Sequence, residues 1–285
     1  MVRDKSKMRR CLMDRLIVLG TGAANALHHY NTCFMLQGPE GSLLVDGGGG
    51  NGILVQLDKA GISLLDLTDI FVTHEHIDHS LGIIWLVRMV SSLFLQEKRN
   101  DILRIHCHTR LSEKLRSICQ FTLSEKQFAP VGTSIRFVPV KDGEQRSIAG
   151  HTVTFFNTHS RKTEQYGFHM ESQNGQRIVC TGDEPCQPVC GHYLESADWL
   201  FHEAFCTDAD TDVFRPHLIG HGTVKEAALL ARKHHVRNIV LWHTEDRTPS
   251  PLRRERYGEE ARSVFRGGVH IPDDLDIIDL HETPR

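Results

Sequence analysis

Short apolar runs, each of strand length, recur along the whole chain. In order, they are RLIVLG, CFMLQG, SLLVDGG, DIFVTH, ILRIHC, SIRFVPV, HTVTFFNTH, QYGFHME, RIVCTGD, ADWLFHEA and NIVLWH. Between them, the pattern predicts helices near residues 51–60, 80–97, 111–120 and 222–235, with Thr223 as a suitable N-cap for the last. Strands and helices alternate in both halves without a Pro/Ser-rich linker. The pattern therefore predicts one α/β domain in which helices flank two sheets.

Composition and charge narrow the class of protein. Of the 285 residues, 40% are apolar and 24% are charged, which is typical of a soluble globular protein. The net charge of -3 provides no overall basic field for nucleic acid, so any contact with a polyanion has to be local. The longest apolar run, LGIIWLVRMV, is too short to span a bilayer and contains Arg88, so we expect no membrane association. Residues 1–13 are basic and are expected to form a flexible tail, whereas residues 14–285 form the single domain.

The eight cysteines show no disulfide-like spacing, which favours reduced thiols and a cytoplasmic location. One cluster, Cys180, Cys186, Cys190 and His192, raises the alternative of a second metal site. Its spacing differs from that of zinc ribbons and fingers, so we favour cysteines of the core or of loops.

Histidines and acids follow several of the apolar runs directly. Five endings show this feature: Val72-Thr73-His74, Asn157-Thr158-His159, Cys180-Thr181-Gly182-Asp183, Phe201-His202-Glu203 and Leu241-Trp242-His243. Parallel strands collect functional groups at their carboxyl ends. We therefore expect these five endings to converge on one site.

The stretch THEHIDHSLG is the densest of these groups and contains His74, His76, Asp78 and His79. The two imidazoles at i and i+2 of a tight loop can point to one metal ion, and the acid and imidazole at i+4 and i+5 can point to another. A polar helix cap whose histidines face water is the alternative interpretation. A run of three histidines and two acids at the end of a buried strand favours the metal site.

The spacing His-x-His-x-Asp-His resembles the signature of the metallo-β-lactamase superfamily, and the resemblance extends along nearly the whole chain. It implies a four-layer αβ/βα sandwich with a metal site at one edge of its two sheets. The implied ligands of one ion are His74, His76 and His159, those of the other are Asp78, His79 and His243, and Asp183 is shared. Two divalent ions would activate a water and stabilise negative charge in an in-line displacement. Histidine and carboxylate ligands suit Zn(II), although Mn(II) or Fe(II) would also fit.

Further stretches resemble the ribonuclease Z branch of that superfamily. LFHEAF resembles its His-Glu-Ala-Thr motif and IGHGT its Gly-His-Ser-Thr motif. The resemblance implies that His221 assists departure of the leaving oxygen and that Asp78 positions or deprotonates the water. Glu203 is the candidate orienting partner of His202 or His221. Arg247, in LWHTEDR, occupies the place of an arginine in this branch and is a candidate phosphate ligand.

Two departures argue against processing of tRNA 3′ ends. The branch carries a long tRNA-gripping arm between the third metal histidine and the bridging aspartate, but only 23 residues separate His159 from Asp183 here. The opening loop GTGAANALHHYNT also lacks the branch's lysine and arginine and retains only its asparagine, Asn31. We interpret this loop as a substrate rim that includes His28, Tyr30 and Asn31. A phosphate cradle, a metal site and an ordinary turn are its alternatives.

The sequence therefore predicts a dinuclear-metal phosphodiesterase of the ribonuclease Z-like group that acts on a small or nucleotide phosphodiester. One alternative is RNA processing, in which the basic N-terminal tail would replace the missing arm. Lactone or thioester hydrolysis, an iron oxidoreductase of the same fold, and a non-catalytic metal-binding partner subunit are the others. A homodimer formed through the apolar segments after His79 is also expected.

Overall fold

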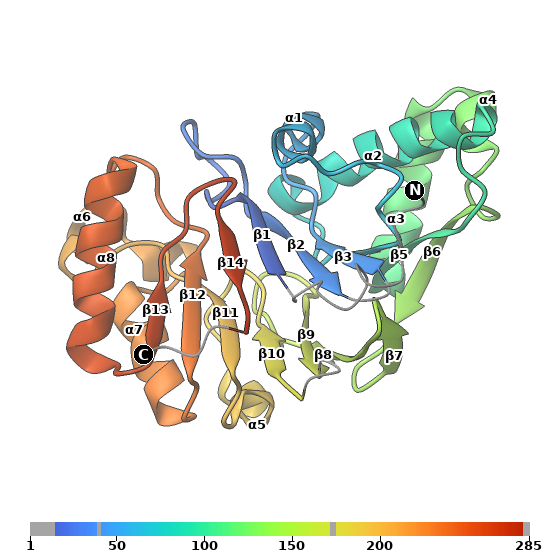
Figure 1. Ribbon diagram of the computed structural model, residues 1–285. Coiled ribbons are helices and arrows are strands. Elements are labelled where there is room, and N and C mark those ends of the chain that lie inside the picture. The colour runs from blue at the N-terminus through green and yellow to red at the C-terminus, as the bar shows by residue number, and fades with distance from the viewer. Residues whose placement is uncertain (1–14, 39–40, 172–174, 282–285) are drawn as a thin grey trace, which may run out of the picture.

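Two seven-stranded sheets face each other in the computed structural model, which describes residues 15–38, 41–171 and 175–281. The helices lie outside the sheets: α1 to α4 gather over the first sheet, and α6 to α8 lie at the outer side of the second (Figure 1). The basic tail predicted for residues 1–13 falls outside the described residues.

The first sheet has the strand order β14-β1-β2-β3-β4-β5-β6. Neighbours from β14 to β3 are antiparallel, and neighbours from β3 to β6 are parallel. Its strands are β1 (Arg15–Gly20), β2 (Cys33–Gly38), β3 (Gly41–Val45), β4 (Asp69–Phe71), β5 (Leu103–His108), β6 (Ile135–Val140) and β14 (Ile277–Asp279).

The second sheet has the order β13-β12-β11-β10-β9-β8-β7. Its strands from β10 to β13 are parallel, and those from β7 to β10 are antiparallel. They are β7 (Gln145–Ile148), β8 (His151–Asn157), β9 (Tyr166–Glu171), β10 (Arg177–Cys180), β11 (Trp199–Glu203), β12 (Asn238–Trp242) and β13 (Gly268–His270).

The helices divide between the two outer layers. Those of the first half are α1 (Gly52–Lys59), α2 (Ile77–Leu95), α3 (Thr109–Thr122) and α4 (Glu125–Phe128). Those of the second half are α5 (Gly191–Leu194), α6 (Thr211–Phe214), α7 (Val224–Lys233) and α8 (Ser250–Val264), with single 3-10 turns η2 (Pro188–Cys190), η3 (Asp208–Asp210) and η4 (Pro216–Ile219). Thr223 caps α7 through a capping box with Glu226, as its sequence predicts.

Three buried apolar clusters separate the four layers. One lies between the first sheet and α1 to α3, the second between the two sheets, and the third between the second sheet and α5, α7 and α8. Phe34 and Trp242, from opposite sheets, stack in the middle cluster with ring centroids 4.6 Å apart. These layers confirm the predicted αβ/βα sandwich, because each sheet buries one face on its own helices and the other on the second sheet.

The sequence pattern missed several elements. It indicated no helix at α8, whose buried residues Arg253, Tyr257 and Ala261 recur every four positions but include a charged side chain. The short strands β7, β13 and β14 were also missed, since each has only three or four residues. Helix α2 begins at Ile77, three residues before the predicted start.

Helix α2 is, within the described ranges, the one helix long and apolar enough to cross a membrane. Half of its apolar window is buried inside the protein, and its buried apolar residues belong to the cluster between the first sheet and its helices. Asp78 and His79 in its first turn are buried as well. Length and apolarity are therefore explained by its place as a core helix.

A glycine-rich turn, residues 47–52, lies in close contact with α2 and with the opening loop. A Cβ atom on Gly82 of α2 would come 1.8 Å from the carbonyl oxygen of Gly47, and one on Gly48 would come 2.4 Å from the ring of Tyr30. Gly82 N donates to Gly48 O, and Gly47 N donates to His79 O. These contacts hold the start of α2 against the end of β3, because glycine alone permits the close approach.

We predict that Gly82→Ala destabilises the protein by roughly 1–3 kcal/mol or more, because the added methyl group overlaps the Gly47 carbonyl oxygen. Alanine has the better helix propensity, so propensity alone would change stability in the opposite direction. Gly50→Ala is the matched control, since its Cβ would meet no atom within 4 Å. Urea unfolding measures both variants, and equal free energies of unfolding would contradict the prediction.

Candidate metal centre

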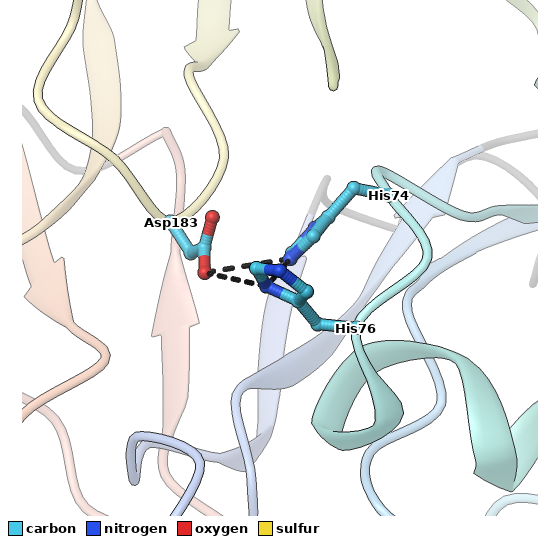
Figure 2. A group of neighbouring side chains, drawn as sticks. All are labelled: His74, His76 and Asp183. Carbon is cyan, nitrogen blue, oxygen red and sulfur yellow. Dashed lines mark hydrogen bonds and ion pairs between the residues drawn. The ribbon is translucent and has the colours of Figure 1, made fainter. Parts of the chain in front are cut away.

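Four of the five predicted strand endings meet at one edge of the sandwich. His74 and His76 lie in the loop after β4, Asp183 follows β10, and His243 follows β12. Glu203 is the last residue of β11 and lies behind them. Figure 2 shows His74 and His76 pointing across the edge toward Asp183. Asp78 and His79, expected in a tight loop, instead form part of the first turn of α2.

The carboxylate of Asp183 occupies the centre of this group. Its Oδ2 atom lies 3.4 Å from Nε2 of His74 and 4.0 Å from Nδ1 of His76. The same oxygen lies 3.7 Å from Nε2 of His79 and 3.7 Å from Nε2 of His243. One oxygen atom therefore faces four imidazoles, which is the arrangement expected of a carboxylate shared by two ions.

Asp78, His79 and His243 form the second cluster of ligand atoms. Oδ2 of Asp78 lies 3.3 Å from Nε2 of His79 and 3.6 Å from Nε2 of His243. All three side chains are buried. His243 has a left-handed backbone with φ of 56°, a strained conformation for a residue with a side chain, and such strain concentrates at functional sites.

Asp46, which sequence reasoning missed, orients the imidazole of His79. Its Oδ2 atom lies 2.7 Å from Nδ1 of His79, and its two oxygens also accept hydrogen bonds from the backbone N–H and the hydroxyl of Thr73. A carboxylate that holds one ring nitrogen directs the other nitrogen to a metal. The signal was present in SLLVDGG, where an acid follows an apolar run, as it does at the other endings.

Electrostatics keep both central carboxyl groups ionised. Burial alone would raise the pKa of Asp78, but the imidazoles of His243 and His79 beside it outweigh burial and hold the pKa well below its ordinary value. Burial likewise opposes ionisation of Asp183, and the charge and hydrogen bond of His74 depress its pKa strongly. The pKa of His243 is lowered, mainly by burial. The carboxylates are thus ionised and His243 favours its neutral form, as metal ligation requires. Burial opposes protonation of His79, but the carboxylates of Asp46 and Asp78 raise its pKa well above the ordinary value, so a metal ion would displace that proton.

His159, the third imidazole expected for the first ion, is exposed and belongs to none of the clusters of ligand atoms found among the described residues. Its backbone is left-handed, with φ of 55°, and its N–H donates to Oδ1 of Asn157. The buried Gln165, which sequence reasoning did not single out, instead contacts the centre. Its Nε2 donates to Oδ1 of Asp183 at 2.5 Å and lies 3.4 Å from Nδ1 of His74.

Glu203 partners His221 rather than His202. Oε2 of Glu203 lies 3.6 Å from Nδ1 of His221, and neither atom has a hydrogen-bond partner within the described part of the chain. Oε1 of Glu203 accepts from the Gly222 N–H. The ring of His202 contacts the backbone through both nitrogens: Nε2 accepts from Cys186 N, and Nδ1 lies 2.6 Å from Glu203 O.

His221 also shares a third cluster of ligand atoms with Asp183 and His243. Its ring stacks on Phe205 with centroids 5.3 Å apart. Burial, reinforced by the charge of Lys162, lowers the pKa of His221. Burial raises the pKa of Glu203 to about 7. The carboxyl group of Glu203 therefore stays protonated to a higher pH than an ordinary glutamate does.

A cleft of about 470 Å³ opens over the metal centre. Its lining includes residues of both metal clusters, His221, Lys162 and, from the opening loop, Ala24. The volume falls in the range of sites for small molecules and cofactors.

The opening loop is held by carboxylates of the protein itself. Asp274 accepts hydrogen bonds from the N–H groups of Thr21 and Tyr30, and Asp246 accepts from those of Leu27 and His28. N–H groups that already donate to carboxylates cannot cradle a phosphate, which rules out that alternative for this loop.

The predicted rim residues lie in different environments. The hydroxyl of Tyr30 donates to Gly47 O at 2.9 Å and to Gly50 O at 3.1 Å, and Asn31 Nδ2 donates to Ala23 O. These two side chains thus stabilise the loop. His28 is exposed. The guanidinium of Arg247 lies over Phe214, 5.6 Å from the ring centroid, and is not among the described residues that line the cleft.

The cysteine cluster forms no metal site within the part of the chain that the structure describes. Cys180 is buried between the two sheets, and Cys190 packs under α7 and α8. The ring of His192 contacts Val189 O through Nδ1. This arrangement agrees with the favoured interpretation of core and loop cysteines.

The residues present fit divalent metal ions. Nε2 of His79 and both ring nitrogens of His243 are buried and lack a hydrogen-bond partner among the described residues. Leaving such groups unpaired costs about 1–3 kcal/mol each, and a cation facing them removes this cost. Imidazole and carboxylate groups are also the donor set that zinc and similar ions accept.

Comparisons with known proteins agree with this geometry. The sequence profile of the family described as anti-Pycsar protein Apyc1 matches residues 14–256. The ribonuclease Z of Gemmatimonas aurantiaca is 28% identical over 274 residues, which cover 80% of this chain and 84% of that relative. These findings confirm the predicted similarity to the ribonuclease Z branch.

Two solved structures share the fold. The metallo-β-lactamase fold protein YhfI from Bacillus subtilis aligns with a TM-score of 0.73 and 21% identity, covering 93% of this chain and 99% of its own. The short form of human tRNase Z aligns with a TM-score of 0.69 and 23% identity, with the same coverage of 93% and 99%. The expected metallo-β-lactamase fold is confirmed.

We predict a pH dependence of stability from Glu203 in the metal-free protein. Its pKa rises from 4.5 to about 7 on folding, mainly through burial. Between these values the folded state binds more protons than the unfolded chain. The free energy of unfolding therefore falls by roughly 3 kcal/mol as pH rises from about 4.5 to about 7.

Glu203→Gln, which stays neutral, should lack this part of the pH dependence, whereas Glu113→Gln, on the exposed face of α3, should retain it. Urea unfolding after EDTA treatment, at pH 5 and pH 8, measures the difference. The same pH slope in Glu203→Gln as in the unsubstituted protein would exclude a raised pKa for this carboxyl group.

Proposed function

The chain belongs to the family of anti-Pycsar protein Apyc1, and we propose that it is a metal-dependent phosphodiesterase of the ribonuclease Z-like group that hydrolyses a small, cyclic or nucleotide phosphodiester. One observation carries the proposal: two clusters of buried metal-ligating side chains share Asp183 below a cleft that also exposes His221. The ribonuclease Z relatives support hydrolysis of phosphodiesters as the class of reaction.

The proposed ligands are those that the sequence indicated. His74 and His76 would hold one ion, Asp78, His79 and His243 the other, and Asp183 both. His159 would complete the first set only if its exposed side chain turned inward. We favour Zn(II), which imidazole and carboxylate groups suit. When bound, the ions would supply an activated water and neutralise charge on the phosphoryl oxygens.

The protein's own groups would orient water and transfer the proton. Asp78 stays ionised and would accept a hydrogen bond from the attacking water, which orients the water toward phosphorus. Glu203 faces Nδ1 of His221, and the raised pKa of its carboxyl group favours the protonated form. The carboxyl proton would pass to Nδ1 as Nε2–H protonates the leaving oxygen. General acid catalysis of this kind contributes typically 10²- to 10⁴-fold.

The cleft supports a small substrate in preference to RNA. Its volume of about 470 Å³ suits one or two nucleotide units. Residues 20–32 contain no lysine or arginine that could hold an extended backbone. A homodimer and a cytoplasmic location complete the proposal as predictions from the sequence.

The direct test uses bis(p-nitrophenyl) phosphate as substrate. We expect the protein loaded with two metals per chain to hydrolyse it, and His74→Ala to reduce the rate by roughly 100-fold or more through loss of a metal ligand. His192→Gln, an exposed histidine outside the centre, serves as control. A metal-loaded protein that is inactive, or a His74→Ala variant that behaves identically, would refute the proposal.

Proton donation by His221 makes a separate prediction. His221→Ala should reduce kcat roughly 100-fold or more for a diester that releases an alkoxide, such as a cyclic nucleotide, which needs a proton on departure. It should reduce kcat far less for bis(p-nitrophenyl) phosphate, whose nitrophenolate leaves unaided.

His217→Gln, whose exposed ring pairs with Glu226, is the matched control. Steady-state rates on both substrates decide the question. An equal loss on both would assign His221 to metal ligation, consistent with its contacts to Asp183 and His243.

A further inference from the structure

The cleft over the metal centre contains a single basic side chain among the described residues that line it, Lys162. Its ammonium nitrogen lies 3.4 Å from Nε2 of His221. The ammonium group carries three hydrogens, and its contact with His221 uses at most one of them. No ion pair within 4.0 Å is formed by Lys162 in the described part of the chain. Its positive charge is therefore available to a molecule in the cleft.

The loop between β8 and β9 holds Lys162 in this place. The hydroxyl of Ser160 donates to Oε1 of Glu184 at 2.6 Å and accepts from the N–H groups of Lys162 and Thr163. The N–H of Arg161 donates to the other oxygen of Glu184. Glu184 is buried and directly follows Asp183. The lysine is therefore connected to the same segment as the shared carboxylate.

Gly220 provides the room for the lysine side chain. A Cβ atom at this position would come 2.2 Å from Cε of Lys162, and the residue has a left-handed φ of 74°. The lysine stem thus lies directly over the glycine that precedes His221. Backbone contacts on one side and this glycine on the other direct the ammonium group into the cleft.

The remaining charges of the cleft explain what the ammonium would bind. Asp78 and Asp183 face the proposed metal ions, and the third carboxylate of the lining, Glu75, pairs with Lys114. The opening loop contributes only Ala24 to the lining and no basic residue. An anion that reaches the ions would therefore meet its one protein cation at the His221 side. Hydrogen bonds from ammonium to phosphate oxygens are charge-assisted and roughly twice as strong as neutral ones.

We propose that Lys162 is the anion-binding residue of the cleft and donates to a non-bridging phosphoryl oxygen of the substrate beside His221. This inference rests on the proposed function and deepens it, because it assigns the substrate a negative charge at the reacting phosphorus. Lys162 would contribute mainly to binding of the phosphoryl group.

The test measures binding of inorganic phosphate to the metal-loaded protein by calorimetry. We expect Lys162→Met to raise the Kd for phosphate about 10-fold or more, the loss of one charge-assisted hydrogen bond. Lys162→Arg, which keeps the charge, should stay within about 3-fold of the unsubstituted protein. Lys141→Met, an exposed lysine of the loop after β6, is the matched control and should leave the Kd unchanged.

Steady-state hydrolysis of bis(p-nitrophenyl) phosphate then separates the two proposals. A raised KM with kcat little changed in Lys162→Met agrees with phosphate binding. A lower kcat with unchanged Kd for phosphate would overturn the inference and leave Lys162 as a support for His221. Absence of measurable phosphate binding in the unsubstituted protein would overturn it as well. Phosphate binding that depends on Lys162, in a protein that cleaves no diester, would refute the proposed function and keep this inference.

Discussion

Two carboxylates buried among imidazoles are the constraint on which the rest of this structure depends. Asp78 and Asp183 are each 4% exposed, and both are held ionised by the histidines around them. Burying such charges costs several kcal/mol each unless cations or hydrogen bonds compensate. Gln165 provides one hydrogen bond to Asp183. Most of the cost of burying these two negative charges therefore has to be offset by protonated histidines, or by metal ions bound to the histidines in their neutral form.

The sandwich brings distant segments of the chain to one edge, where contacts with neighbouring residues restrict the positions of the side chains. Close contact between the glycine turn and Gly82 sets the start of α2, and Asp46 fixes the ring of His79 from the end of β3. The proposed metal ligands therefore lie on a framework that other contacts of the fold hold in place. Such preorganisation favours affinity, because few rotamers have to be lost on binding.

The substrate side of the site is organised differently from the metal side. Asp246 and Asp274 accept hydrogen bonds from N–H groups of the opening loop, so this loop offers no backbone nest for an anion. His221 and Lys162 line the cleft instead, and the buried Glu203 faces His221 from behind. In the proposed function, the reacting group would lie between the proposed metal ions and these three side chains.

Sequence patterns determined the fold class, the two-sheet organisation and most of the chemistry, because strand-length runs and the residues that end them are local features. Local patterns also left α8 undetected, since its buried face includes the charged Arg253, which hydrogen-bonds to Thr244 and Asp273 outside the helix. Sequence patterns also could not show whether His202 or His221 is the partner of Glu203.

Only the tertiary structure decided which side chains join the site. It brought Asp46, Gln165 and Lys162 to the centre through contacts with residues 33, 91 and 59 positions away. In the folded protein, the side chain of His159 is exposed, and the hydroxyl of Tyr30 hydrogen-bonds to the glycine-rich turn at Gly47. Spacing along the chain indicates which residues are neighbours within one helix or strand. Contacts between the two sheets depend on how all the layers pack, which the spacing does not indicate.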